Sequence, residues 1–227
     1  MINKIYNENC LETMSRMSDN YIDLTLTSPP YDNLRTYNGY SFDFESIAKE
    51  LYRITKDGGV VVWIVGDATI KGSETGTSFK QALYFKQIGF NLHDTMIYNK
   101  HSTTPVGGVN RYYQRFEYMF VFSKGKPNKF NAITRKRINK HNDKRKYRIK
   151  KTSRNKDGTF NVRKVKINEV VKISNVWTYI PNNSGNKIES KHPAIFPEQL
   201  AKDHIITWTN ERDLVYDCFM VVEQQLN

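Results

Sequence analysis

The segment Thr27-Ser28-Pro29-Pro30-Tyr31 carries residue types that suit chemistry on a planar amino group. It closes a predicted strand, residues 23–27, which the two prolines terminate. The prolines fix the backbone and remove two N–H donors, so the Ser28 hydroxyl and nearby carbonyl oxygens can accept hydrogen bonds from an NH2 group. The Tyr31 ring can stack on the attached base. An ordinary Pro-Pro turn is the alternative interpretation.

Alternating strands and helices are expected to position this segment. A continuous apolar run at residues 60–65 predicts a strand buried on both faces of a sheet. Apolar spacing predicts a helix over residues 43–55 that Asp57-Gly58-Gly59 closes. The other expected helices are 12–17, 77–88 and 197–208, and the other expected strands are 4–6, 91–98, 117–122 and 214–219. This order predicts an α/β fold with helices on both faces of the sheet.

The basic residues are concentrated in one stretch. Residues 135–166 hold 15 Lys or Arg and 2 acidic residues, a net charge of +13, whereas the rest of the 227-residue chain holds 20 and 21, a net charge of −1. A basic block of this kind favours a polyanionic partner, and nucleic acid is the first candidate. A solvated basic loop or disordered insert is the alternative. The block contains few large apolar residues, so we expect an insertion outside the sheet.

Several protein classes are disfavoured by composition. No apolar run approaches the roughly 18 residues of a membrane span, and residues 1–14 lack the apolar core of a signal peptide. Only Cys10 and Cys218 are present, which excludes a disulfide scaffold and suits a reducing cytoplasm. The five histidines show no ligand spacing, so no metal is expected, and His204 is expected on a helix surface.

The chain resembles the amino-directed DNA methyltransferases, which modify N4 of cytosine or N6 of adenine. Their catalytic motif is Asp/Asn/Ser-Pro-Pro-Tyr/Phe, and Ser28-Pro29-Pro30-Tyr31 has this pattern. Other segments resemble family elements in the same order: Glu8-Asn9-Cys10-Leu11, Asp57-Gly58-Gly59, residues 115–122, residues 191–197 and Asp217-Cys218-Phe219-Met220. With the catalytic motif first and the cofactor loop last, this order resembles the beta group. Protein-glutamine methyltransferases and many RNA methyltransferases usually have the reverse order.

The resemblance implies a Rossmann-like, three-layer fold whose mostly parallel sheet has one reversed strand in the order 3-2-1-4-5-7-6. Residues 1–134 and 167–227 would form a discontinuous catalytic domain. Residues 135–166 would be the DNA target-recognition region, because the beta group has its own at this place. The implied cofactor is S-adenosylmethionine and the implied partner is double-stranded DNA, with no membrane and with a homodimer left open. A role in restriction-modification is implied as well.

The resemblance also implies roles for individual residues. Ser28 and the carbonyl region of Pro29 and Pro30 would hold the amine of a flipped base, with Tyr31 stacked on it. The implied cofactor-binding residues are Asn9 and Cys10 near the adenine, Thr27 and Ser28 at the end of their strand, His192, Pro193, Ala194 and Phe196 at the methionine end, and Asp217 and Phe219 at the entry loop. The implied DNA-binding residues are Arg135, Lys136, Arg137, Lys144, Arg145, Lys146, Arg148, Lys150 and Lys151. Ser at the first motif position favours cytosine N4 over adenine N6.

One family element is absent after Met220. The family has Gly-Ser-Gly-Thr-Thr there, and this chain has Val221-Val222-Glu223-Gln224-Gln225, which lacks the glycines that let a backbone approach a nucleotide. Codons for these residues can encode Gly-Ser-Gly-Thr-Thr-Thr in a neighbouring frame, so we hypothesise a frameshift; natural divergence is the alternative. We expect a helix and a strand beyond Asn227 to be missing, with weak or no cofactor binding and low stability. A non-catalytic DNA-binding relic or subunit is therefore the rival function.

Overall fold

The computed structural model describes residues 3–30, 42–101, 110–137, 146–180 and 197–220. The chain divides into two compact units. Met1–Asn131 and Asn175–Asn227 form the first, here called the sheet unit. Ala132–Ser174 form the second, here called the basic unit.

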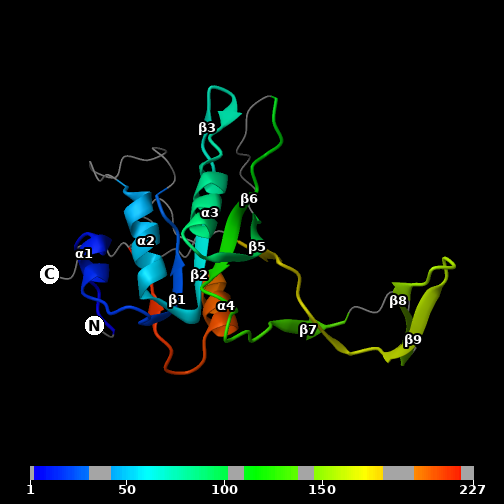
Figure 1. Cartoon of the computed structure of the whole chain (residues 1–227). Coiled ribbons are helices and arrows are strands. Elements are labelled where there is room, and N and C mark those ends of the chain that lie inside the picture. The colour runs from blue at the N-terminus through cyan, green and yellow to red at the C-terminus, as the bar shows by residue number, and fades with distance from the viewer. Residues whose placement is uncertain (1–2, 31–41, 102–109, 138–145, 181–196, 221–227) are drawn as a thin grey trace. The chain divides into compact units, whose positions relative to one another are not determined.

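A six-stranded sheet organises the sheet unit (Figure 1). Its order is β11 (Val176–Tyr179), β5 (Asn91–Lys100), β6 (Phe116–Ser123), β2 (Thr55–Val65), β1 (Ile22–Thr27) and β12 (Val215–Tyr216). β6 runs antiparallel to β2 and β5, and every other neighbouring pair is parallel. The carboxyl ends of the five parallel strands therefore meet at one edge. The reversed strand and the order β5-β6-β2-β1-β12 confirm the expected Rossmann-like arrangement.

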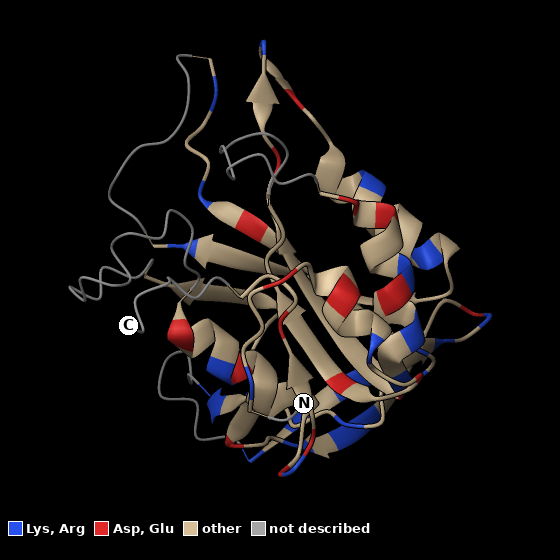
Figure 2. Cartoon of the chain, turned by 90° about the vertical axis from the view of Figure 1, so that its left-hand side faces the viewer, with Lys and Arg blue, Asp and Glu red and all other residues tan. Residues whose placement is uncertain are grey.

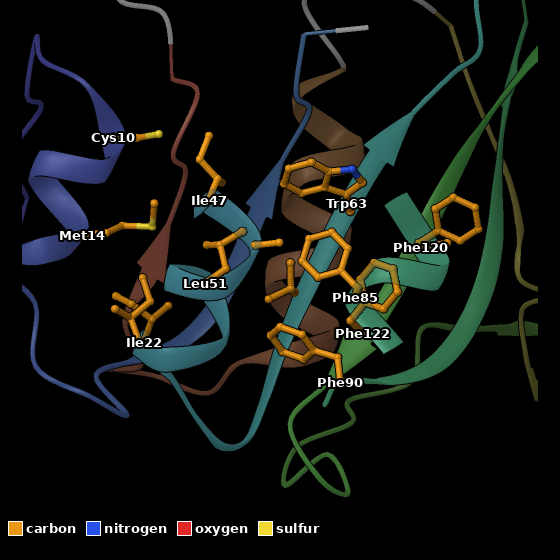
Figure 3. Packing of buried hydrophobic residues seen from close by; sticks show 14 of the residues in the cluster. Cys10, Met14, Ile22, Ile47, Leu51, Trp63, Phe85, Phe90, Phe120 and Phe122 are labelled. Carbon is orange, nitrogen blue, oxygen red and sulfur yellow. The ribbon is translucent and has the colours of Figure 1, made fainter. Parts of the chain in front are cut away.

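β2 is buried on both faces, as its apolar run predicts. Val61, Trp63 and Val65 belong to a core cluster that also contains residues of α1 (Cys10–Ser15), α2 (Phe44–Ile54) and α3 (Thr77–Gln87). Figure 3 shows this packing, with Cys10 and Met14 coming from α1. The alternate residues of β2 are buried outside that cluster. A strand with period-two side chains that is buried at every position must be covered on both faces.

The opposite face is covered by α4 (Glu198–Trp208), which gives the fold its third layer (Figure 1). Its buried residues include Leu200, His204 and Trp208. His204 is fully buried, with Nε2 3.3 Å from the Met119 sulfur and its ring 4.6 Å from that of Trp177. The prediction that His204 lies on a helix surface is wrong, because its face of α4 is the one that packs on the sheet.

Four of the predicted elements differ clearly from those in the structure. Residues 4–6 form no strand. The first helix spans Cys10–Ser15 where 12–17 was expected, and β12 has two residues where 214–219 was expected. α2 ends at Ile54 and passes directly into β2, so Asp57-Gly58-Gly59 does not close the helix. These residues form an irregularity in the pairing of β2 with β1, and Gly58 has a φ of +76° there, a backbone conformation that favours glycine.

Charged side chains join β1 to its neighbours at the amino end of the sheet. The buried Asp23 carboxylate accepts from Lys56 Nζ at 2.6 Å, Lys129 Nζ at 2.8 Å and the Leu214 backbone N–H at 3.0 Å. Burial alone would raise the pKa of Asp23, but these three hydrogen bonds hold it below its ordinary value. Asp23 therefore links β1 to the start of β12 and is a structural residue.

The basic unit contains two antiparallel strand pairs. β7 (Thr134–Lys136) pairs with β10 (Val170–Lys172), and β8 (Tyr147–Arg154) pairs with β9 (Phe160–Lys166). Neither pair belongs to the six-stranded sheet. Among the described residues, no helix has the length and hydropathy needed to cross a bilayer.

Candidate active site at the carboxyl edge of the sheet

The ends of β1 and β12 are joined side chain to side chain. β1 pairs in parallel with β12, with Thr25 opposite Tyr216, so both strands end at the same edge. The buried Thr27 hydroxyl donates to Asp217 Oδ1 at 2.6 Å, and the Phe219 backbone N–H donates to the same oxygen at 2.9 Å. Two segments 190 residues apart in the sequence therefore meet at this edge.

The two ionisable side chains that follow β12, Asp217 and Cys218, lose their protons less readily than usual. Burial raises the pKa of Asp217, and the hydrogen bonds from Thr27 and Phe219 offset only part of this effect. Burial likewise raises the pKa of the Cys218 thiol well above its ordinary value. Cys218 lies with its sulfur 3.8 Å from Thr27 Oγ1. Because a nucleophilic cysteine requires the thiolate, Cys218 is poorly suited to covalent catalysis.

Ser28, Pro29 and Pro30 leave the sheet directly after Thr27. Pro29 is buried, whereas Ser28 and Pro30 are half-buried. Because Thr27 is hydrogen-bonded to Asp217, the chain leaves β1 at Ser28 near the end of β12. Tyr31 lies outside the described residues.

The first turn of α1 contributes the third segment. Asn9 caps the helix, its side-chain oxygen accepting from the Leu11 N–H at 3.0 Å. Cys10 is buried in the core cluster against which Tyr216, Cys218 and Phe219 pack. Of the expected adenine-contacting pair, Cys10 thus packs in the same region as the end of β12, whereas the Asn9 side chain is exposed.

Phe219 is anchored in this region by aromatic contacts. Its ring centroid lies 5.6 Å from that of Phe42 and 6.0 Å from that of Trp63, both in edge-on geometry. These contacts fix where the chain goes after Asp217. Phe219 therefore has a packing role whatever else it contacts.

Asp67 lies at the same edge and was not predicted as a site residue from the sequence. It follows β2, and its carboxylate accepts from the Ser78 N–H at 2.9 Å, from the Ser78 hydroxyl and from the Thr75 hydroxyl at 3.4 Å. It holds the start of α3 against the end of β2. The signal available in the sequence was its position, one residue after the Gly66 that ends a buried strand.

The predicted methionine-end residues His192, Pro193, Ala194 and Phe196 lie outside the described residues, as do the predicted DNA-binding residues Lys144 and Arg145. Arg135 and Lys136 are exposed on β7. Arg137 is half-buried and its guanidinium donates to the Asn168 carbonyl at 3.0 Å. Lys146, Arg148, Lys150 and Lys151 are exposed at or on β8. Figure 2 shows that Lys and Arg residues are interspersed with Asp and Glu residues along the helices.

Comparison with known proteins identifies relatives along almost the whole chain. Residues 22–221 match the family model of the N6/N4 DNA methylases. The orphan methyltransferase M.BamHII of Bacillus amyloliquefaciens is 56% identical over 211 residues, which cover 90% of this chain and 78% of that protein. The type II methyltransferase M.BglII of Bacillus subtilis is 22% identical over 230 residues, covering 96% of this chain and 60% of that protein.

Solved structures share the fold. The PvuII DNA methyltransferase, described as cytosine-N4-specific, aligns with a TM-score of 0.65 at 21% identity, covering 93% of this chain and 72% of that one. M1.HpyAVI in complex with S-adenosylmethionine aligns with a TM-score of 0.56 at 18% identity, covering 94% of this chain and 81% of that one.

Proposed function

Because the chain belongs to the N6/N4 DNA methylase family, we propose that it transfers a methyl group from S-adenosylmethionine to an exocyclic amino group of a base in double-stranded DNA. One observation carries this proposal. The hydrogen bond of 2.6 Å from Thr27 to Asp217 joins the strand that leads into Ser28-Pro29-Pro30-Tyr31 to the strand that leads into the cofactor segment. Open α/β sheets bind ligands at this edge, where parallel strands end.

The residues at the end of β12 suit a positively charged cofactor. Asp217 is a carboxyl group whose ionisation is opposed by burial, and a cationic ligand beside it would offset that cost. S-adenosylmethionine, when bound, supplies an electrophilic methyl group on a positively charged sulfur. Asn9 and Cys10 would hold its adenine, Thr27, Ser28, Asp217 and Phe219 would border it at the strand ends, and His192, Pro193, Ala194 and Phe196 would hold its methionine end.

Ser28 and the proline carbonyls are proposed to orient the target amine. Oxygen acceptors hold the two N–H groups so that the nitrogen lone pair points at the methyl group, and Tyr31 stacks on the base. The base must leave the duplex to reach this edge, at a cost of a few kcal/mol. Cytosine N4 is the proposed acceptor, because Ser at position 28 resembles the cytosine-N4 pattern.

Cofactor affinity is proposed to be weak. Val221 and Glu223 stand where the family has glycines, and side chains there restrict the close backbone approach that a nucleotide needs. Isothermal titration with S-adenosylmethionine measures this directly. Low-micromolar binding would refute the proposed weakness without affecting the proposed reaction.

The absence of these two glycines favours a second candidate function, a DNA-binding protein that no longer catalyses. A transfer assay with tritium-labelled S-adenosylmethionine at saturating concentration separates the two. We expect label in duplex DNA with the wild type and with the exposed-residue control Ser18→Ala, and strongly reduced label with Ser28→Ala. DNA binding without label in any of the three proteins would support the non-catalytic function.

A further inference from the structure

The β8–β9 hairpin is an exposed two-stranded ribbon. All eight residues of β8 are exposed, and so are six of the seven residues of β9. Its turn is closed by hydrogen bonds within residues 155–159, including Asn155 N–H to Thr159 O at 2.8 Å. A hairpin of this kind buries little apolar surface by itself. We therefore expect contact with a partner molecule to stabilise this exposed hairpin.

The charge of the ribbon indicates that this partner is an anion. Residues 146–166 contain nine Lys or Arg and one acidic residue, Asp157. The Asp157 carboxylate accepts from the Thr159 N–H at 2.9 Å and from its hydroxyl at 2.7 Å, so it is engaged in the turn. The paired strands themselves therefore carry positive charge and no acidic residue.

The register gives the ribbon two different faces. Directly opposite residues share a face in an antiparallel pair. One face, here the tyrosine face, carries the paired residues Tyr147 with Lys166, Ile149 with Lys164 and Lys151 with Val162. The other, here the arginine face, carries Arg148 with Val165 and Lys150 with Arg163.

On the tyrosine face, lysines contact aromatic rings. Lys164 Nζ lies 4.7 Å from the centroid of Tyr147, and Lys151 Nζ lies 4.9 Å from that of Phe160. These cation–π contacts stabilise the hairpin and partly occupy the ammonium groups. The tyrosine face is therefore the face that holds the ribbon together.

On the arginine face, cations face one another. Lys150 is directly opposite Arg163, and like charges at such a position destabilise a strand pair. Arg148 lies two residues from Lys150 on the same face. An arrangement that costs stability in the isolated hairpin becomes favourable when an acceptor-rich polyanion lies against it.

The dimensions of the ribbon fit one groove of DNA. The major groove of B-DNA is about 12 Å wide and admits a two-stranded β-ribbon, whereas the minor groove is about 6 Å wide. Guanidinium groups pair with the O6 and N7 acceptors of guanine in the major groove, and this is the commonest specific contact in protein–DNA complexes. β-ribbons read bases in this way in other protein architectures.

We propose that the β8–β9 hairpin enters the DNA major groove with its arginine face toward the base edges, and that Arg148 and Arg163 select guanine in the recognised sequence. This inference rests on duplex DNA being the substrate in the proposed function. It adds which element reads the DNA, which groove it enters and which of its two faces meets the bases.

The test uses the full-length chain and compares the two DNA grooves and the two faces of the hairpin. Fluorescence anisotropy measures the Kd for a short labelled DNA duplex, for the same duplex with glucosylated hydroxymethylcytosine filling the major groove, and for the plain duplex with netropsin filling the minor groove. We expect glucosylation to weaken binding about ten-fold or more and netropsin to have little effect. Equal binding to the glucosylated duplex, equal binding to an RNA duplex of the same sequence, or competition by netropsin would overturn the proposal.

Matched variants test the two faces. Arg148→Ala and Arg163→Ala should each weaken binding to guanine-rich duplexes about ten-fold and to adenine–thymine duplexes much less. Lys164→Ala and Lys166→Ala, on the tyrosine face, should weaken both kinds of duplex alike. Equal effects from the two faces would overturn the assignment. Methyl transfer is measured separately. DNA binding through the arginine face without methyl transfer would refute the proposed function alone. Methyl transfer with DNA binding that does not depend on the major groove would refute this inference alone.

Discussion

His204 should make the stability of the protein depend on pH between neutrality and pH 4.5. The imidazole is fully buried, its Nε2 lies 3.3 Å from the Met119 sulfur, and its Nδ1 has no hydrogen-bond partner among the described residues. Burial lowers the pKa of His204 to about 3, because the charged form would lose its hydration. The replacement His204→Gln removes the titrating group while keeping a polar side chain.

The magnitude follows from the two pKa values. In the unfolded chain His204 takes up a proton near pH 6.5, and in the folded protein only near pH 3. Stability is therefore complete above pH 6.5 and is lost as the pH falls toward 3. Each pH unit in this window costs about 1.4 kcal/mol, so the wild type should lose about 3 kcal/mol between pH 6.5 and pH 4.5 through this residue.

Urea unfolding followed by tryptophan fluorescence at pH 7 and pH 4.5 measures the effect. We expect the free energy of unfolding of the wild type to fall by about 3 kcal/mol more than that of His204→Gln. His93→Gln provides the matched control, because it removes an exposed imidazole in place of a buried one. Working at pH 4.5 keeps the buried Asp23 ionised, since its pKa lies below its ordinary value of 3.8. An identical pH dependence in the wild type and His204→Gln would show that His204 does not cause it.

Three further substitutions test the sheet and its carboxyl edge. Asp23→Asn removes the carboxylate that pairs with two lysines and should lower the free energy of unfolding by about 3 kcal/mol in urea titrations. Asp23→Glu, which keeps the charge, is the control. A loss below about 0.5 kcal/mol for Asp23→Asn would contradict its linking role. Thr27→Val removes the donor to Asp217 at nearly constant volume and should cost about 1–2 kcal/mol, whereas Thr27→Ser should restore most of it; equal losses would argue against the hydrogen bond. Ser28→Ala should lower kcat while the Kd for DNA stays unchanged, and an equal change in both would contradict a role in orienting the amine.

The core strands could be predicted from sequence because their signal is local. The run Val60 to Val65 is apolar at every position, and only a strand covered on both faces buries all of it. Pro197 marks the start of α4 because a proline is tolerated only at the beginning of a helix. The meeting of Thr27 with Asp217 at one edge also follows from the order of the motifs in the resembled family.

Other elements depend on distant partners and could not be predicted in this way. β11, Val176–Tyr179, was not predicted; it pairs with β5, some 80 residues earlier, and nothing in its four residues specifies that neighbour. Residues 4–6 have strand-like composition and still form no strand, since a strand is stabilised by its pairing. For His204 a signal existed: Leu200, His204 and Trp208 recur every four residues, which places His204 on the buried stripe of α4.

The proposed reaction is tested most directly by mass analysis of nucleosides. Duplex DNA is incubated with the chain and saturating S-adenosylmethionine that carries an isotope-labelled methyl group, and is then digested. We expect labelled N4-methylcytosine with the wild type and none with Ser28→Ala. Label on adenine N6 would correct the proposed base alone. A folded protein that binds the duplex and leaves every amino group unlabelled would contradict the proposed function.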